Sequence, residues 1–235
     1  MRIRPTIVLV HGAFAESAGW NKVIGALLRA DYPVIASANP LRGVANDART
    51  LSDHVRTIDG PVVLVAHSYG GAVISNVDPD AGDIRALVYV AAFAPAPGES
   101  CLQLTSRFPG STLEANAEAI PRADGSIELA IARDRFHAQF AADVSPAEAA
   151  LMAATQRPIA QAALEEAADA RPLWEEIPSS FVFGDLDRSI PAAALRWMAE
   201  RTGARRTLEL PGASHAVAVS RPSETADVIL RAASA

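Results

Sequence analysis

The chain has 235 residues, and 50% of them are hydrophobic, which is enough to bury one sizeable core. Its 21 lysine and arginine residues against 27 aspartate and glutamate residues give a net charge of −6. Because no basic block occurs in the sequence, we expect neither nucleic acid nor an anionic membrane surface as a partner. The length predicts one domain, with room for an inserted subdomain.

We expect no targeting or membrane segment. The first apolar run is only Thr6–Val10, whereas a secretory signal needs roughly 7–15 apolar residues and a membrane span needs ~20. The single cysteine, Cys101, excludes an intramolecular disulfide and any site built from several thiolates. These features are typical of a soluble, cytoplasmic protein.

In the first part of the chain, short apolar runs alternate with helical patterns. Apolar residues recur at helical spacing from Trp20 to Leu28 and from Ala48 to Ile58. A helix of small residues should follow the third run. The runs themselves predict strands at residues 6–10, 33–37, 61–66 and 84–92.

Residues 95–175 interrupt this alternation. The segment is rich in Ala, Glu and Gln and shows no clear strand pattern. The stretch "SPAE", Ser145 to Glu148, has the form of a helix N-terminus, with Ser as the cap, Pro in the first helical position and Glu three residues after the cap. We predict a helical cap insertion over the edge of the sheet, between two parts of one core, 1–94 and 176–235.

The alternation resumes after the insertion. Strands are predicted at 179–184 and 206–212, with a helix at 191–202 between them and a final helix from about Pro222. The strands are nearly all apolar, which is expected when helices cover both faces of a parallel sheet. The chain therefore belongs to the α/β class.

The stretch "LVAHSYGGAV", residues 64–73, places Ser68 where a strand ends and a helix begins. A sharp turn there would expose the serine and strain its backbone, and it requires small neighbours such as Ala66 and Gly70. The pattern is A-x-S-x-G, with alanine where glycine is more usual. A glycine-rich turn with an incidental serine is the alternative interpretation.

A second loop, "VHGAF" at residues 10–14, directly follows the first strand. Gly12 frees the backbone, so that the N–H of Ala13 can point into a cavity. Together with the N–H of Tyr69, it would form an oxyanion hole with two donors. For His11 we expect a structural role, because polar groups in packed turns usually find hydrogen-bond partners.

Two late loops supply an acid and a base. "FGDLDRSIP" at 183–191 contains both Asp185 and Asp187, and "PGASHAV" at 211–217 contains His215. Each loop follows a predicted strand, and open α/β sheets place their sites at that edge. The order serine, aspartate, histidine along the chain is that of the α/β-hydrolases.

Over nearly the whole chain, the segments "HGAF", "AHSYGGAV", "GDLDRSIP" and "PGASHA" resemble the motifs of the α/β-hydrolase superfamily. The chain is similar to small bacterial esterase-like hydrolases related to plant methyl-ester esterases and hydroxynitrile lyases, and to pyrethroid-type carboxylesterases. The resemblance implies an α/β-hydrolase fold with about six mostly parallel strands, because the chain starts close to the family's third strand.

The same resemblance assigns roles to single residues. The family's G-x-x-D pattern ends here at Asp187, which leaves Asp185 to cap the loop. Gly12 and Ala216 stand where the family's lyases typically carry other residues, which favours ester hydrolysis over cyanohydrin cleavage. The stretch between Gly12 and Trp20 departs from the plant pattern, so we expect a different pocket entrance.

The expected reaction is hydrolysis of a carboxylic ester of a small, largely apolar substrate, with no metal and no organic cofactor. Ser68 would attack, His215 would act as base, and Asp187 would orient it. The expected pocket lies between the sheet edge and the insertion, although packing in the core is the alternative for its aromatic and Met side chains. Its candidate lining residues are Phe14, Tyr69, Phe136, Phe140, Met152 and Trp174.

Other functions remain open at this point. The same three residues serve in lyase, thioesterase, lactonase and perhydrolase reactions, whereas Ser68 argues against the dehalogenases and epoxide hydrolases of this fold, which use Asp as the nucleophile. A non-hydrolytic small-molecule-binding protein of the same fold is a further alternative. The sequence leaves open the acyl and alcohol groups of the substrate and the oligomeric state, a homodimer included.

Overall fold

A computed structural model describes residues 4–169 and 171–235 of the chain. Six strands form one sheet in the order β2-β1-β3-β4-β8-β9, and every neighbouring pair is parallel. The strands are β1 (Thr6–Val10), β2 (Val34–Ser37), β3 (Pro61–His67), β4 (Asp83–Val90), β8 (Ser179–Gly184) and β9 (Arg206–Leu210). The predicted fold class and each predicted strand are confirmed.

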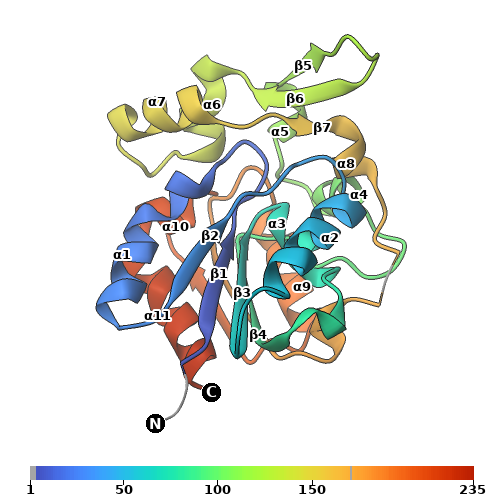
Figure 1. Cartoon of the computed structure of the whole chain (residues 1–235). Helices are drawn as coiled ribbons and strands as arrows, with labels where there is room; N and C mark the ends of the chain where they lie inside the picture. The colour runs from blue at the N-terminus through green and yellow to red at the C-terminus, as the bar shows by residue number, and fades with distance from the viewer. Residues whose placement is uncertain (1–3, 170) are drawn as a thin grey trace.

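Helices cover both faces of this sheet, which explains its continuous apolar strands. In β1, Ile7, Val8 and Leu9 are completely buried. Helices α1 (Asn21–Arg29) and α11 (Pro222–Ser234) pack together on one side, and α2 (Val44–Val55) and α9 (Ala192–Arg201) lie on the other (Figure 1). Short helices connect them: η1 (Ser17–Trp20), α3 (Gly70–Ser75), η2 (Pro79–Ala81) and α10 (Val217–Ser220).

The segment between β4 and β8 forms a cap above the upper end of the sheet (Figure 1). Its helix α7 begins as predicted, since Pro146 follows Ser145 and the Ser145 hydroxyl accepts the N–H of Glu148. The helices of the cap are α4 (Cys101–Ser106), α5 (Leu113–Asn116), α6 (Arg133–Phe140), α7 (Pro146–Thr155), α8 (Gln161–Glu165) and η3 (Leu173–Glu175).

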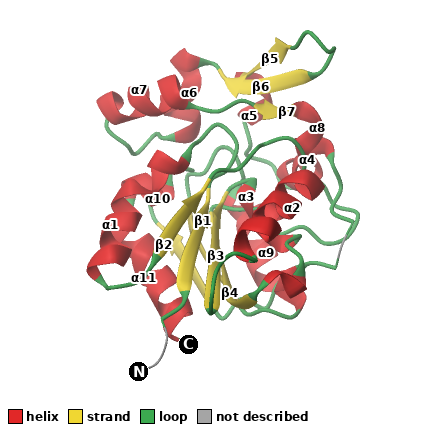
Figure 2. Cartoon of the chain, in the orientation of Figure 1, coloured by secondary structure: helices red, strands yellow, loops and turns green. Residues whose placement is uncertain are grey.

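The expectation of an insertion without strands is wrong. A three-stranded antiparallel sheet, β5 (Ala117–Pro121), β6 (Ile127–Ile131) and β7 (Ile159–Ala160), lies beside α6 and α7 (Figure 2). Asp124 and Gly125 form the turn of its hairpin, because Gly125 has a φ of 84° and the Asp124 carboxylate accepts the N–H of Ser126.

Backbone hydrogen bonds join the cap to the loops that follow β1 and β2. The N–H of Phe14 donates to the carbonyl of Arg157, and the N–H of Ala160 donates to the carbonyl of Leu41. These two loops at the carboxyl edge of the sheet are therefore held by the cap as well as by their own strands. Among the residues described, no helix combines the length and the apolar character that crossing a membrane requires.

Candidate active site

Ser68 occupies a strained turn between β3 and α3. Its φ is 54°, in the left-handed region that non-glycine residues rarely adopt, at a cost of about 1–3 kcal/mol. The helix starts close to the loop that follows β4: a Cβ at Gly71 would lie 2.2 Å from the carbonyl oxygen of Phe93. The two predicted features of the turn, a strained serine and a close approach that needs glycine, are both present.

The loop after β1 lies directly against Ser68. A Cβ at Gly12 would lie 2.5 Å from the Ser68 Cβ, so only glycine fits there. Within residues 4–169 and 171–235, the backbone N–H groups of Ala13 and Tyr69 donate to no partner. Both peptide groups adjoin the Gly12–Ser68 contact, where an oxyanion hole requires free donors.

His215 and Asp187 form a buried hydrogen-bonded pair. The Nδ1–H of His215 donates to Asp187 Oδ2 at 2.6 Å, and both side chains are at most 1% exposed. The second carboxylate oxygen accepts the N–H groups of Ser189 and Ile190 at 2.8 and 2.9 Å. This fully bonded carboxylate fixes the His215 tautomer with its lone pair on Nε2.

The Nε2 atom of His215 is buried and has no hydrogen-bond partner among the described residues. The structure therefore joins Asp187 to His215 and shows no hydrogen bond from His215 to Ser68. Hydrogen bonds of this kind are often long in the absence of substrate. A buried imidazole nitrogen with a lone pair and no hydrogen-bond partner is able to accept a proton.

Asp185 has a different position from Asp187. It is exposed, and its Oδ1 accepts the N–H of Gly212 at 2.7 Å. This bond ties the loop after β8 to the loop after β9, which is the loop that carries His215. Of the two acids in the G-x-x-D pattern, only Asp187 contacts the histidine.

His11 holds the loop after β1, as expected from its position beside a turn glycine. Its Nε2 accepts the backbone N–H of Asn39 at 3.0 Å, so the proton is on Nδ1, which donates to the carbonyl of Gly12 at 2.9 Å. Burial lowers the pKa of His11 below its usual value. A neutral imidazole with both nitrogens bonded is a structural group here.

His67 is a site residue that sequence reasoning missed, although it stands next to Ser68. Its ring lies 4.6 Å from the ring of His215, and its Nε2–H donates to the His215 carbonyl at 3.1 Å. Burial, aided by the nearby His215, lowers the pKa of His67 well below its usual value. A neutral His67 thus joins the turn of Ser68 to the loop of His215 without adding a charge.

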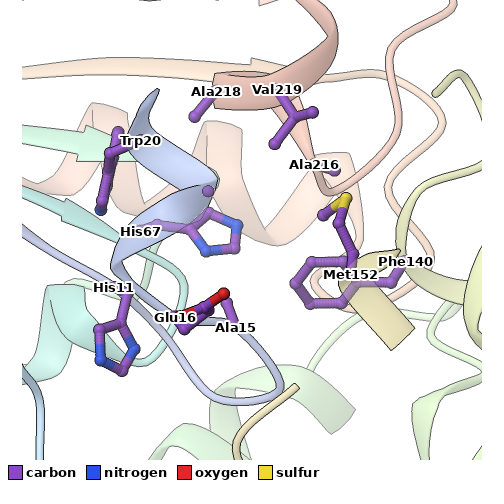
Figure 3. A pocket seen from close by; sticks show the side chains of 11 residues that line it. His11, Ala15, Glu16, Trp20, His67, Phe140, Met152, Ala216, Ala218 and Val219 are labelled. Carbon is purple, nitrogen blue, oxygen red and sulfur yellow. The ribbon is translucent and has the colours of Figure 1, made fainter. Parts of the chain in front are cut away.

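A small cavity of about 20 Å³ lies beside His67. Figure 3 shows His11 and His67 from the core facing Phe140 and Met152 from the cap. The Phe140 ring is also 4.8 Å from the ring of His215. The remaining lining residues are Ala15, Glu16, Gly19, Trp20, Ala216, Ala218 and Val219.

Several predicted pocket residues do not line this cavity. Phe136 is completely buried and stacks on Phe140 inside the cap, and Phe14 is also buried. Trp174 donates its Nε1–H to the Pro95 carbonyl at 3.0 Å, and Arg201 lies over its ring. Phe14 and Phe136 pack in the core and Trp174 packs against it, as the alternative interpretation held.

The Tyr69 side chain also turns away from the cavity. It is completely buried, and its hydroxyl donates to Asp47 on α2 at 2.9 Å. Its backbone N–H, by contrast, is one of the free donors described above. Across the described residues, no three His, Cys, Asp or Glu side chains are grouped so that they could hold a metal ion.

Comparison with known proteins agrees with this geometry. The model of the alpha/beta hydrolase family matches residues 7–228. The chain belongs to the alpha/beta hydrolase family. This confirms the superfamily that the four sequence motifs indicated.

Individual relatives point to the esterase-like part of the family. Esterase PIR7B of rice, Oryza sativa subsp. japonica, is 29% identical over 96% of this chain and 94% of its own length. A carbendazim hydrolyzing esterase of Nocardioides is 36% identical, over 41% of this chain and 46% of that protein. The structure of a pyrethroid hydrolase from Sphingobium faniae superposes with a TM-score of 0.76 at 23% identity, covering 98% of each chain.

Proposed function

We propose that this chain hydrolyses carboxylic esters of small, largely apolar substrates, with Ser68 as nucleophile, His215 as base and Asp187 as its orienting acid. The observation that carries the proposal is the buried His215–Asp187 pair, whose Nε2 has no partner among the described residues. The strained turn at Ser68, the free N–H groups and the names of the relatives support it.

In the proposed first half-reaction, His215 Nε2 removes the proton of Ser68 as its oxygen attacks the ester carbonyl. Asp187 stabilises the imidazolium that forms. The N–H groups of Ala13 and Tyr69 stabilise the tetrahedral oxyanion, each contributing on the order of 10²–10³ in rate. The imidazolium then protonates the leaving alcohol, which departs and leaves an acyl group on Ser68.

Water completes the cycle. A water molecule attacks the acyl carbonyl while His215 takes a proton from that water. The second tetrahedral intermediate then collapses, the proton returns to Ser68, and the acid is released. A neutral His67 suits both steps, because a second cation 4.6 Å from His215 would oppose formation of the imidazolium.

The lining of the cavity supports an apolar substrate. Most of the residues that line the cavity beside His67 are apolar. Met152 and Phe140 bring the cap to this cavity, so the cap restricts the group that can lie beside the histidines. An ester with an apolar group beside His67 suits this lining better than one with a negatively charged group, since Glu16 also lines the cavity.

The decisive experiment measures turnover of a chromogenic short-chain ester by Ser68→Ala. Loss of such a nucleophile should lower kcat by roughly 10⁶. Near-wild-type turnover by this variant would refute the proposal. A fluorophosphonate should also label the wild-type chain rapidly, and His215→Ala should abolish the labelling. Tight binding of a small molecule with neither labelling nor turnover would instead indicate a non-hydrolytic binding protein.

A further inference from the structure

A buried carboxylate outside the proposed triad is connected to the proposed oxyanion hole through the side chain of Tyr69. Asp47, in the first turn of α2, is 1% exposed. Its two oxygens accept the backbone N–H of Arg42 at 3.1 and 3.2 Å and the Tyr69 hydroxyl at 2.9 Å, and Asn46 donates its side-chain amide at 3.0 Å. A carboxylate with this many donors is a fixed anchor, because burying a charge is costly unless its bonds are satisfied.

Tyr69 connects this anchor to the reacting centre. Its side chain is completely buried, and burial together with the charge of Asp47 raises the pKa of the phenol, which therefore stays protonated and donates at every working pH. Its backbone N–H belongs to the peptide that follows Ser68. The hydrogen bond from the phenol to Asp47 thus holds the side chain of Tyr69, and the backbone N–H of the same residue is a proposed oxyanion donor.

The turn and the Tyr69 side chain together hold that peptide. Ser68 is in the left-handed region, where an ordinary residue is strained, and α3 after it is a short helix of 6 residues. The carbonyl of Ser68 accepts the N–H groups of Gly71 and Phe93. The N–H of Tyr69 has no partner of its own among the described residues, so its direction is set by the Ser68 carbonyl of the same planar peptide and by how the rest of Tyr69 is held.

We propose that Asp47 is a positioning residue for ester hydrolysis, which acts through the Tyr69 phenol to direct the Tyr69 N–H at the oxyanion. This inference rests on the proposed function. Asp47 touches no reacting atom. It contributes by keeping a preorganised donor in place, so the effect is made in the transition state more than in substrate binding.

Tyr69→Phe is the central test, because it removes only the hydroxyl that reaches Asp47. We expect kcat for a short-chain ester to fall about ten- to a hundredfold, less than the about 10²–10³ that loss of a whole donor costs, with KM little changed. The affinity for a boronic acid that mimics the tetrahedral intermediate should fall by a similar factor, whereas the affinity for the product alcohol should not.

Asp47→Asn should give a similar loss of kcat. The double variant Asp47→Asn/Tyr69→Phe should be no worse than the more affected single variant, because both changes break the same connection. Tyr89→Phe is the matched control. Tyr89 is also completely buried, and its hydroxyl is 2.8 Å from that of Ser75, yet its backbone lies within β4. This control should lose thermal stability and keep its kcat.

The result that overturns the inference is a folded Tyr69→Phe enzyme with wild-type kcat and wild-type affinity for the boronic acid. An equal loss of kcat in Tyr89→Phe would also overturn it, since the effect would then be one of general stability. If Asp47→Asn does not fold, Tyr69→Phe and its control decide alone. Failure of the proposed function looks different, because Ser68→Ala would then retain turnover.

Discussion

The main sheet and the cap differ in what holds them together. The main sheet is buried on both faces, and β3 is completely buried from Val62 to Ala66. The hairpin of the cap has most of β5 in contact with solvent. Its other strand packs Ile131 into the core, and a side chain adds further bonds: the amide of Gln156 both accepts the N–H of Ile131 and donates to its carbonyl.

This difference suits the roles we propose for the two regions. Reacting groups need to be held within fractions of an ångström, which apolar packing of a rigid sheet can achieve. Ser68, Asp187 and His215 all follow strands of the main sheet. The cap contributes apolar side chains to the cavity and no member of the proposed triad. We therefore expect changes in the core to abolish turnover and changes in the cap to alter substrate choice.

The largest effect is expected for Asp187→Asn. An amide at this position would let His215 adopt the wrong tautomer, so kcat should fall by about 10⁴ while the fold persists. Asp185→Asn, two residues away, is the matched control and should keep nearly full turnover. Steady-state kinetics on both variants make the comparison. Equal losses of kcat in the two variants would mean that Asp187 is wrongly assigned as the acid that orients His215.

Gly12→Ala should be the next most severe change. The added Cβ would lie 2.5 Å from the Ser68 Cβ and 2.7 Å from the carbonyl oxygen of His67, and neither can easily move. We expect kcat/KM to fall at least about a hundredfold, with a loss of about 1–3 kcal/mol in the free energy of unfolding. Gly25→Ala in α1, where the nearest atom to an added Cβ is at the flexible end of Arg29 at 3.4 Å, is the control and should keep wild-type kcat/KM.

Acid should destabilise the core through its buried histidines. The pKa of His67 is lower in the folded chain than the value of about 6.5 expected when unfolded, so below that pH the unfolded chain binds more protons. The free energy of unfolding should therefore have its full value above pH 6.5. It should fall as the pH drops, by up to about 1.4 kcal/mol per pH unit for this group. His11 adds to the trend with the same sign.

Urea titrations between pH 7.5 and about 5.5 measure this slope, in a range above most carboxylate pKa values. His67→Gln, which can still donate to the His215 carbonyl, should show a shallower dependence than wild type. An unchanged slope in that variant would show that His67 does not carry the effect.

The smallest effect is expected in the cap. Met152→Ala should enlarge the cavity and raise the preference for a bulky over a small ester, measured as a ratio of kcat/KM values, by about tenfold or less. Leu151→Ala, one residue earlier on α7, removes an exposed side chain and should change nothing. A large loss of turnover on small esters in Met152→Ala would contradict the division of roles between core and cap.

Much of the fold and the proposed site follows from local patterns in the sequence. The apolar run at Thr6–Val10 is β1 itself, and the glycines after Ser68 mark where α3 begins. Loops that follow parallel strands meet at one edge of the sheet, so the order of Ser68, Asp187 and His215 along the chain was enough to predict that they share this edge.

A local signal for the cap hairpin was present but outweighed. Asp124 and Gly125 separate two runs with alternating character, which is a recognised pattern for a hairpin, yet the abundance of Ala and Glu in the segment favoured helices. The sequence also contained a signal for the buried position of Asp47. It lies on the apolar face of α2, between Val44 and Ala48, where a charge requires a partner.

The sequence by itself determined the parallel sheet, the family and the candidates for nucleophile, acid and base, because strand patterns, turns and motifs depend on neighbouring residues. Only the tertiary structure decided which aromatic side chains face the cavity, where the Tyr69 hydroxyl finds its acceptor, and that His67 lies against His215. These contacts join segments far apart in the chain. Their partners are selected by packing and burial, which no local pattern records.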